Sequence, residues 1–372
     1  MGLVPMRVLL RAAEKGGYAV GAYNVNNMEQ AQGIMAAAVQ TESPLIYQVS
    51  RGALQYSNKE ILRDIILSIV NMNPQVPVAL HLDHGNSPES CIEAIKLGFT
   101  SVMMDGSLQE NGKTPSDYGY NRDVTRAVVK YAHERGVTVE GEIGCLGGLE
   151  DGHGSGEERI TLPGDLQRLF ADCGMDACAI AWGTSHGAYK GVKGQPPKLR
   201  HDVVRACHEQ APGVYLVSHG SSSVPAELVE KVNSFGVIRK YVGADGHKHL
   251  SAYGEDFDLE IADPKKVLDF LVESQRMPES VGVPMEDLQQ AIQEGMRKIN
   301  VDTDGRLAVT GTILDVFEAN PSEFDPRKYL GPARDAIASF AKVGMIGFGS
   351  AGHATDIDQS ITLKEMARQY RQ

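Results

Sequence analysis

The sequence predicts a (β/α)₈ barrel, in which eight parallel strands form a closed ring and helices cover the outside. Short apolar runs alternate along the chain with longer segments of helical periodicity, which is typical of a parallel sheet. Eight such runs occur, and nearly every one ends in a polar side chain able to do chemistry. A barrel would gather these side chains at one face, because barrel active sites lie at the carboxyl ends of the strands. A doubly wound sheet, the structural alternative, would spread them along an edge.

The elements follow in chain order. Strands are expected at Ala19–Tyr23, Leu45–Val49, Val78–Leu82, Ser101–Met104, Thr138–Glu142, Ala177–Ala181, Tyr215–Ser218 and Arg297–Val301. Amphipathic helices are expected between them, among others at Met28–Gln40, Lys59–Asn71, Pro88–Leu97 and Asp123–Arg135.

Residues 237–280 interrupt this alternation between the seventh and eighth strands. They include the acidic stretch "YGEDFDLEIAD" and a predicted helix at Pro264–Ser274, whereas the "HKH" of His247 and His249 is expected in a solvated loop. We interpret the chain, residues 1–372, as a single barrel domain. Its insertion, residues 237–280, would serve as a lid or an interface element.

Composition excludes several classes of protein. The 372 residues carry a formal net charge of −12, which argues against binding to nucleic acid or to anionic membranes. No apolar run reaches the roughly 18 residues of a membrane span, and the first residues lack the pattern of a signal peptide. The five cysteines form no C-x-x-C pair, which fits a reduced, cytoplasmic compartment.

Three histidines stand at expected strand ends, and each is followed by glycine. They are His84 in "LDHG", His186 in "GTSHG" and His219 in "SHGSSS". Three imidazoles with one open coordination position are the pattern of a catalytic zinc site. His81 lies on the same side of its strand as Asp83 but deeper, so we expect it to support the site rather than bind metal.

Two loops favour a phosphate site. "HGSSSVPAEL" places glycine and serines before a helix whose first turn is expected to carry Pro225, and "NVDTDGR" follows the eighth strand. Phosphate sites in barrels are commonly built from the loops after strands 7 and 8, and Lys190 could add a cation. "GFGSAG", residues 347–352, matches a dinucleotide fingerprint, but too little chain follows it for that fold, so we expect a turn and no NAD.

Taken together, these segments resemble the class II, zinc-dependent fructose-bisphosphate aldolases. The match runs through "AYNVNNMEQ", "VALHLDHG", "GFTSVMMDGS", "VEGEIGCLGG", "GTSHGAYK", "SHGSSSVP", "RKINVDTDGRLA" and "FDPRKYL". The sequence looks most like the subgroup that includes Calvin-cycle enzymes acting on both fructose and sedoheptulose bisphosphates. Members usually have a short connection where residues 237–280 stand, and some have a longer mobile loop where "GHGSGEERI" follows Asp151.

The resemblance implies a zinc-dependent, reversible cleavage of fructose 1,6-bisphosphate to dihydroxyacetone phosphate and glyceraldehyde 3-phosphate. The pathway would be glycolysis, gluconeogenesis or the Calvin cycle, and sedoheptulose 1,7-bisphosphate would be a further substrate. A cytoplasmic homodimer or homotetramer is expected, with no nucleic-acid or membrane partner.

The resemblance also implies roles for individual residues. His84, His186 and His219 would bind zinc, with Asp105 and Glu142 close enough to hold a second or displaced cation. Asp83 would handle the proton of the C4 hydroxyl, and Glu150 would remove a proton from dihydroxyacetone phosphate. Groups near the substrate would be Asn24, Ser50 and Asn300. The dihydroxyacetone phosphate end and a monovalent cation, Na⁺ or K⁺, would be held by Gly187, Lys190, Gly220, Ser222, Asp302 and Thr303, and the other phosphate by Arg306.

Three alternatives stay open at this point. A lysine Schiff base could replace the metal, but no strand ends in a lysine directed at the barrel mouth unless Lys298, within the last strand and two residues before Asn300, is so directed. A zinc hydrolase on the same barrel would release phosphate or an amine instead of a triose phosphate. A non-catalytic assembly protein would use residues 237–280 to recruit a partner.

Overall fold

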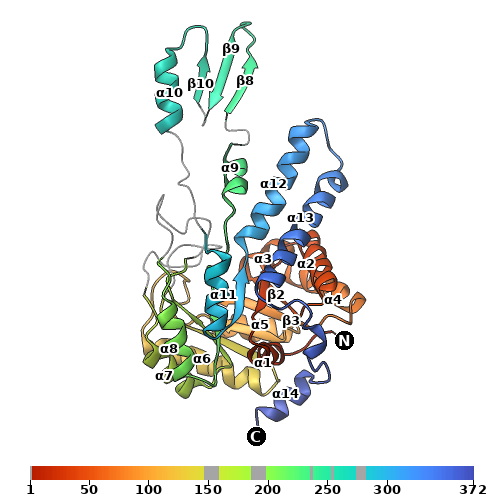
Figure 1. Ribbon diagram of the computed structural model, residues 1–372, viewed down its shortest axis with the longest axis vertical. Coiled ribbons are helices and arrows are strands. Elements are labelled where there is room, and N and C mark those ends of the chain that lie inside the picture. Colours follow the sequence, from red (N-terminus) through yellow and green to blue (C-terminus); the bar gives the residue numbers. More distant parts are fainter. Residues whose placement is uncertain (1, 146–158, 186–197, 235–237, 253–254, 274–281) are drawn as a thin grey trace.

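Eight parallel strands close into a barrel in this computed structural model, and Figure 1 shows them surrounded by helices. The structure describes residues 2–145, 159–185, 198–234, 238–252, 255–273 and 282–372. Around the ring the strands run in the order β1, β11, β7, β6, β5, β4, β3, β2. Their bounds are β1 Val20–Asn24, β2 Leu45–Ser50, β3 Val78–Gly85, β4 Ser101–Met104, β5 Thr138–Ile143, β6 Ala177–Ile180, β7 Tyr215–Ser218 and β11 Met296–Val301.

The predicted barrel is confirmed, and the doubly wound alternative is wrong because the sheet has no open edge. Most predicted strand ends agree to within one residue. β3 is the exception, since it continues three residues past Leu82 and so includes Asp83 and His84.

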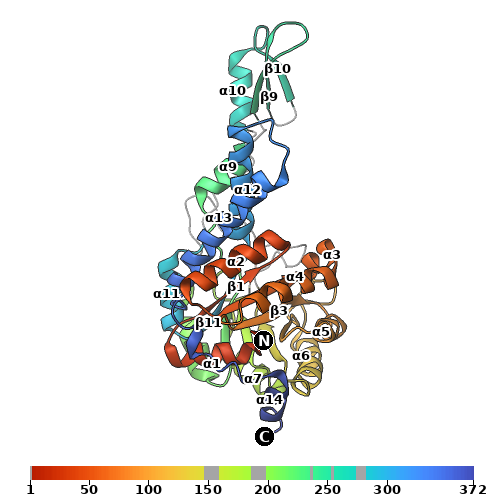
Figure 2. The same cartoon turned by 90° about the vertical axis from the view of Figure 1, so that its right-hand side faces the viewer.

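Helices cover the barrel and extend beyond it. Their bounds are α1 Met6–Gly16, α2 Met28–Thr41, α3 Arg51–Ser57, α4 Lys59–Met72, α5 Pro88–Lys96, α6 Tyr118–His133, α7 Pro163–Cys173, α8 His201–Gln210, α9 Ala226–Ser234, α11 Met285–Gln293, α12 Thr303–Ala319, α13 Pro326–Gly347 and α14 Leu363–Gln369, with a 3₁₀ turn at Ala354–Asp356. α6 begins five residues before the predicted Asp123, because the Asp117 carboxylate accepts a hydrogen bond from the Tyr120 N–H (2.8 Å) and caps the helix there. Residues 347–352 end α13 and form a turn, as expected. Figure 2 shows α12 and α13 rising together beyond the barrel.

Side chains inside the barrel form an apolar layer at one end and a polar layer at the other. Small and medium apolar side chains such as Val20, Ala79 and Val217 point inward and pack against α1, which closes the amino-terminal end of the barrel. Their neighbours in sequence, such as Leu80 and Leu216, point outward to the helices. Inward positions two or four residues further along the same strands carry polar groups, such as Asp83 after Ala79 and His219 after Val217. The fold thus gathers polar side chains at the carboxyl ends of the strands.

The insertion after β7 has its own small sheet, which Figures 1 and 2 show well beyond the barrel. β8 Ile238–Val242, β9 Lys248–Ala252 and β10 Glu255–Asp258 pair antiparallel, and α10 Pro264–Glu273 covers one face through a Phe257–Phe270 ring contact (5.1 Å between centroids). The predicted helix is confirmed to within one residue. The expectation of a loop is wrong for His249, which lies in β9 and whose ring nitrogens bond the carboxylates of Asp245 and Asp256.

None of the helices within these described ranges combines the length and the apolar character that a membrane span requires.

Removing residues 238–273 and joining the ends with a Gly-Ser linker should leave the barrel folded, because β8, β9, β10 and α10 bury their apolar side chains against one another. We expect cooperative thermal unfolding, followed by circular dichroism, with a midpoint within about 3 °C of the full chain. A chain that no longer unfolds cooperatively would contradict this and make the insertion part of the barrel core.

Candidate functional site

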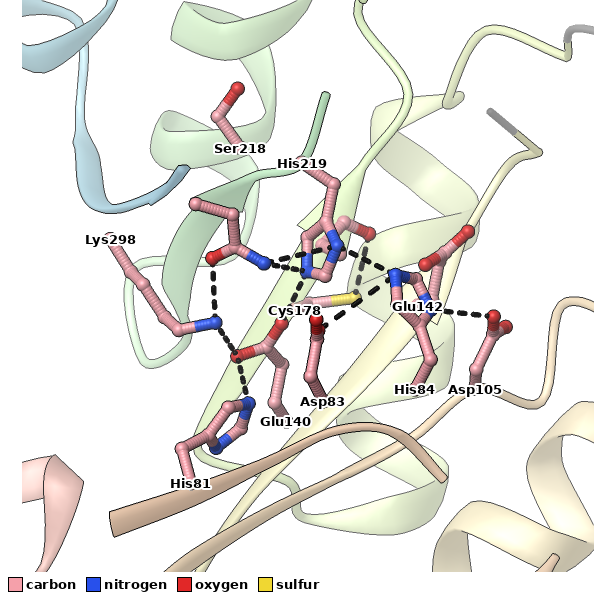
Figure 3. A network of polar contacts seen from close by, with 12 residues as sticks. His81, Asp83, His84, Asp105, Glu140, Glu142, Cys178, Ser218, His219 and Lys298 are labelled. Carbon is pink, nitrogen blue, oxygen red and sulfur yellow. Dashed lines mark hydrogen bonds and ion pairs between the residues drawn. The ribbon is translucent and has the colours of Figure 1, made fainter. Parts of the chain in front are cut away.

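Polar side chains from several strands converge at the carboxyl-terminal mouth of the barrel (Figure 3). Asp83 and His84 come from β3, Glu140 and Glu142 from β5 and Lys298 from β11, while Asp105 and His219 directly follow β4 and β7. All are buried. Inward positions of a strand recur every second residue, so the spacing of Glu140 and Glu142 puts both carboxylates inside the barrel.

The backbone of β3 lets two consecutive residues serve the same site. In a regular strand Asp83 and His84 would point to opposite faces. The pairing of β3 with β4 shifts register between Leu82 and Gly85, and His84 has a left-handed φ of +47°. A Cβ on Gly85 would lie 2.6 Å from the Met103 carbonyl oxygen, so only glycine fits after this bend. Arg51 Nε donates to the His84 carbonyl oxygen (3.3 Å) and holds it in place.

The centre of the site is a pair of imidazoles beside a carboxylate. His84 Nε2 lies 3.0 Å from His219 Nδ1, and the two rings meet edge to face with 4.7 Å between centroids. Asp83 Oδ1 lies 3.8 Å from His84 Nε2 and has no hydrogen-bond partner among the described residues. Asp83 Oδ2 accepts from Asn24 Nδ2 (3.0 Å), whose own Oδ1 accepts from Gln48 Nε2 (2.8 Å). Asp83 is therefore oriented on one side and open toward the imidazoles on the other.

Two more carboxylates lie on the far side of His84. His84 Nδ1 is 3.0 Å from Asp105 Oδ2. The Ser107 hydroxyl lies 2.7 Å from Asp105 Oδ1 and 3.1 Å from Glu142 Oε1, so it links the two acidic groups. Glu142 Oε2 is buried without a hydrogen-bond partner in the part of the chain that is described.

Electrostatics at the site follow from burial and from this crowding of carboxylates. Burial alone would lower the pKa of His84, but Asp83 and Asp105 outweigh it and raise the pKa to about 10. Burial, together with the charge of Asp105, raises the pKa of Glu142 well above its usual range. Burial would also raise the pKa of Asp83, yet the facing imidazoles of His84 and His219 lower it below its ordinary value. Asp83 is therefore ionised at neutral pH.

The donor atoms suit a divalent metal ion. Asp83, His84 and His219 offer ligand atoms that all lie within 4.8 Å of one another, and so do His84, Asp105 and Glu142. Imidazole nitrogens with carboxylate oxygens are the ligands of catalytic zinc sites. The unpartnered Asp83 Oδ1 and Glu142 Oε2 are buried acceptors that a cation would satisfy.

Comparisons with known proteins agree with this geometry. A family model described as "Fructose-bisphosphate aldolase class-II" matches residues 4–278 and 279–353. The chain belongs to the class II fructose-bisphosphate aldolase family. A plasmid-encoded fructose-bisphosphate aldolase of Cupriavidus necator is 43% identical over the full length of both chains. A class 2 fructose-bisphosphate aldolase of Synechocystis is 41% identical over all of this chain and 96% of that one.

Solved structures share the fold of this aldolase. The YdjI aldolase of Escherichia coli K12 aligns with a TM-score of 0.66 and 24% identity, covering 95% of this chain and 99% of that one. The fructose-bisphosphate aldolase of Campylobacter jejuni aligns with a TM-score of 0.63 and 17% identity, covering 94% and 96%. The protein is accordingly a lyase of a family that generally depends on a metal.

Several predicted site residues of the aldolase take part in the described network. Asn24 bonds Asp83, and Asn300 lies with its amide nitrogen 3.0 Å from His219 Nε2. Ser50 accepts from the Ala53 N–H (3.1 Å) and so caps α3. Glu150, His186, Gly187 and Lys190 fall outside the described residues.

The two predicted phosphate loops of the aldolase lie together, joined by a residue that the sequence did not single out. Asp304, in the first turn of α12, accepts from the Ser223 and Val224 N–H groups (2.6 Å each). α9 begins at Ala226, so Pro225 precedes the helix instead of lying in its first turn. Gly220, with φ +60°, approaches Ser185 so closely that a Cβ would lie 2.4 Å from the Ser185 carbonyl oxygen. Because Asp304 accepts from the two N–H groups that follow Ser222, it fixes the position of the loop that contains this buried serine.

Two further predicted site residues, Asp302 and Arg306, form an ion pair in the loop after β11 and the first turn of α12. Asp302 precedes α12 and Thr303 begins it. Arg306 Nε donates a hydrogen bond to Asp302 Oδ1 (2.8 Å), and Arg306 Nη2 forms an ion pair with Asp302 Oδ2 (2.6 Å). Arg306, predicted to bind one substrate phosphate, therefore lies beside the loop predicted to bind the other. The pairing holds both side chains at the end of β11.

Loading the metal-free aldolase with zinc should release protons, because His84 with a pKa of about 10 carries a proton that a metal ligand must lose. We expect about one proton per ion near pH 7.5, and tighter binding as the pH rises toward 10. Calorimetry in buffers of different ionisation enthalpy measures the proton count. Asp105→Asn, which removes one charge that raises this pKa, should move the decline of proton release to a lower pH, and an unchanged pH dependence in this variant would contradict the assignment.

Proposed function

We propose that the aldolase reversibly cleaves fructose 1,6-bisphosphate to dihydroxyacetone phosphate and glyceraldehyde 3-phosphate, with zinc held by His84, His186 and His219. The observation that carries the proposal is the His84–His219 nitrogen pair with Asp83 Oδ1 directed at it. When bound there, zinc supplies Lewis-acid polarisation of the ketose carbonyl. Asp105 and Glu142, which face His84 from the other side, would take a second or displaced cation.

Asp83 is proposed as the group that moves the proton of the substrate's C4 hydroxyl. Breaking the C3–C4 bond requires that this hydroxyl lose a proton, and a base must be ionised and aimed to accept it. The lowered pKa of Asp83 and its hydrogen bond from Asn24 satisfy both needs. Glu150 is proposed for the other proton transfer, at dihydroxyacetone phosphate. Two carboxylates then serve the two halves of the cycle from separate environments.

Phosphate binding is proposed for the two loops that Asp304 joins. Gly220, Ser222, Asp302 and Thr303, with Gly187 and Lys190, would hold the dihydroxyacetone phosphate end together with Na⁺ or K⁺. Asn24, Ser50 and Asn300 would contact the sugar. Arg306 would reach the second phosphate after exchanging its bond to Asp302 for the anion, which is the bidentate contact that guanidinium groups favour.

Sedoheptulose 1,7-bisphosphate is proposed as a further substrate, in line with the resemblance to the Calvin-cycle subgroup. A cytoplasmic homodimer or homotetramer, working in glycolysis, gluconeogenesis or carbon fixation, completes the proposal. The insertion, with exposed Val242 and Ile261 on its sheet and following turn, would serve as an interface element or lid.

Exhaustive chelation should lower the rate of fructose 1,6-bisphosphate cleavage at least about a hundredfold, and added zinc should restore the rate. A coupled assay for triose phosphate follows the reaction, with release of inorganic phosphate measured in parallel. Activity indifferent to chelation would contradict the metal site, and phosphate release without triose phosphate would favour a hydrolase.

Asp83→Ala should lower cleavage by about 10²–10⁴-fold, because the C4 hydroxyl loses its base. Deuterium exchange into dihydroxyacetone phosphate, followed by proton NMR, should continue because Glu150 is intact. Asp123→Ala, which changes an exposed aspartate of α6, is the control and should alter neither rate. Loss of exchange together with cleavage would show that the two roles are misassigned.

A further inference from the structure

A buried lysine beneath the site has no role in the proposed chemistry. Lys298 on β11 is fully buried, and its Nζ lies 3.0 Å from Glu140 Oε2 and 2.7 Å from Asn300 Oδ1. Its ammonium is thus paired below the mouth of the barrel, which is not the arrangement of a Schiff-base lysine directed at substrate. His81 approaches the same carboxylate, with Nε2 3.5 Å from Glu140 Oε2, and bonds Ser101 through Nδ1 (2.8 Å).

A contribution to folding stability does not explain why the Lys298–Glu140 ion pair is buried here. Removing two charges from water opposes folding, and buried ion pairs are often replaceable by apolar residues without loss of stability. The position of the pair suggests another account, because both partners also bond side chains at the metal site. Lys298 bonds Asn300, and Glu140 bonds His219.

The first consequence concerns the amide of Asn300. An ammonium group has three donors and no acceptor, so Asn300 must turn its carbonyl oxygen toward Lys298. The amide nitrogen then lies on the other side, 3.0 and 3.1 Å from the ring nitrogens of His219. Lys298 therefore decides which end of this amide faces the site.

The second consequence concerns the proton on His219. Glu140, paired with Lys298, is an acceptor, and its Oε1 lies 2.8 Å from His219 Nε2. Nε2 must therefore carry the proton. The other ring nitrogen, Nδ1, is left with its lone pair directed at His84 Nε2, where the ligand atoms converge.

We propose that Lys298 and Glu140 are positioning residues. Their buried ion pair fixes His219 as the Nε2–H tautomer and orients the amide of Asn300. Metal affinity then depends on two residues that touch neither metal nor substrate. The proposal rests on the metal site of the proposed function. It adds a requirement one layer below the ligands, since partners of this kind typically change metal affinity by about 10–100-fold.

Three variants separate positioning from stability. In Lys298→Met and Glu140→Leu one buried charge loses its partner, so the thermal midpoint of the metal-free protein should fall in both. Zinc affinity, measured by competition with a chromophoric chelator, should weaken about 10–100-fold. The double variant buries no unpaired charge, so its midpoint should recover toward that of the native chain while its zinc affinity stays weak.

Arg297→Met is the matched control on the same strand. Arg297 Nε pairs with Glu14 Oε2 (2.5 Å), and its Nη1 bonds the Ile292 and Met296 carbonyl oxygens, away from His219. This variant should also lower the thermal midpoint, but its zinc affinity should equal that of the native chain.

Two results would overturn the proposal: native zinc affinity in Lys298→Met, or recovery of affinity together with stability in the double variant. If the variants fail to fold, neutron diffraction from the metal-free native protein decides the same point. A deuteron on His219 Nε2 supports the proposal, and one on Nδ1 contradicts it. A native chain that binds no zinc would defeat the proposed function, whereas native binding with unaffected variants would defeat only this inference.

Discussion

Charge compensation at the mouth of the barrel is the constraint on which the rest of the site depends. Four carboxylates, Asp83, Asp105, Glu140 and Glu142, are buried there around His84 and His219. Lys298 balances one of them, and a protonated His84 balances another. Negative charge remains, and burying it unpaired is strongly unfavourable. A divalent cation would supply the missing positive charge, which agrees with the general metal dependence of the family.

The barrel meets this constraint by separating two layers. Apolar side chains inside the barrel against α1, and a larger apolar layer between the strands and the helices, stabilise the fold, which leaves the next inward positions of the strands available for polar groups. The bend at His84 then brings two adjacent side chains of β3 to one site. Backbone strain of this kind persists where the surroundings fix it, here through Gly85 and the bond from Arg51. The carboxylate proposed for proton transfer can thus stand directly beside a proposed metal ligand.

The barrel could be predicted from the sequence because buried parallel strands leave continuous apolar runs, and their polar ends mark the site. Other features depend on pairings between distant residues. Glu140 carries no signal of its own until the barrel closes and brings β11 and β7 across from it, and Asp304 joins two loops through backbone N–H groups. The last strand of the insertion sheet, β10, could not be predicted because its sequence, "EDFD", has little of the β-branched character that identifies a strand.

The central claim is that His84 and His219 hold the catalytic cation. Crystals of the zinc-loaded enzyme, checked for activity after dissolution, allow the position of the ion to be measured by anomalous diffraction on either side of the zinc absorption edge. The account predicts an anomalous peak in contact with both His84 Nε2 and His219 Nδ1. A peak elsewhere in the molecule, or none at these nitrogens in active crystals, would contradict it.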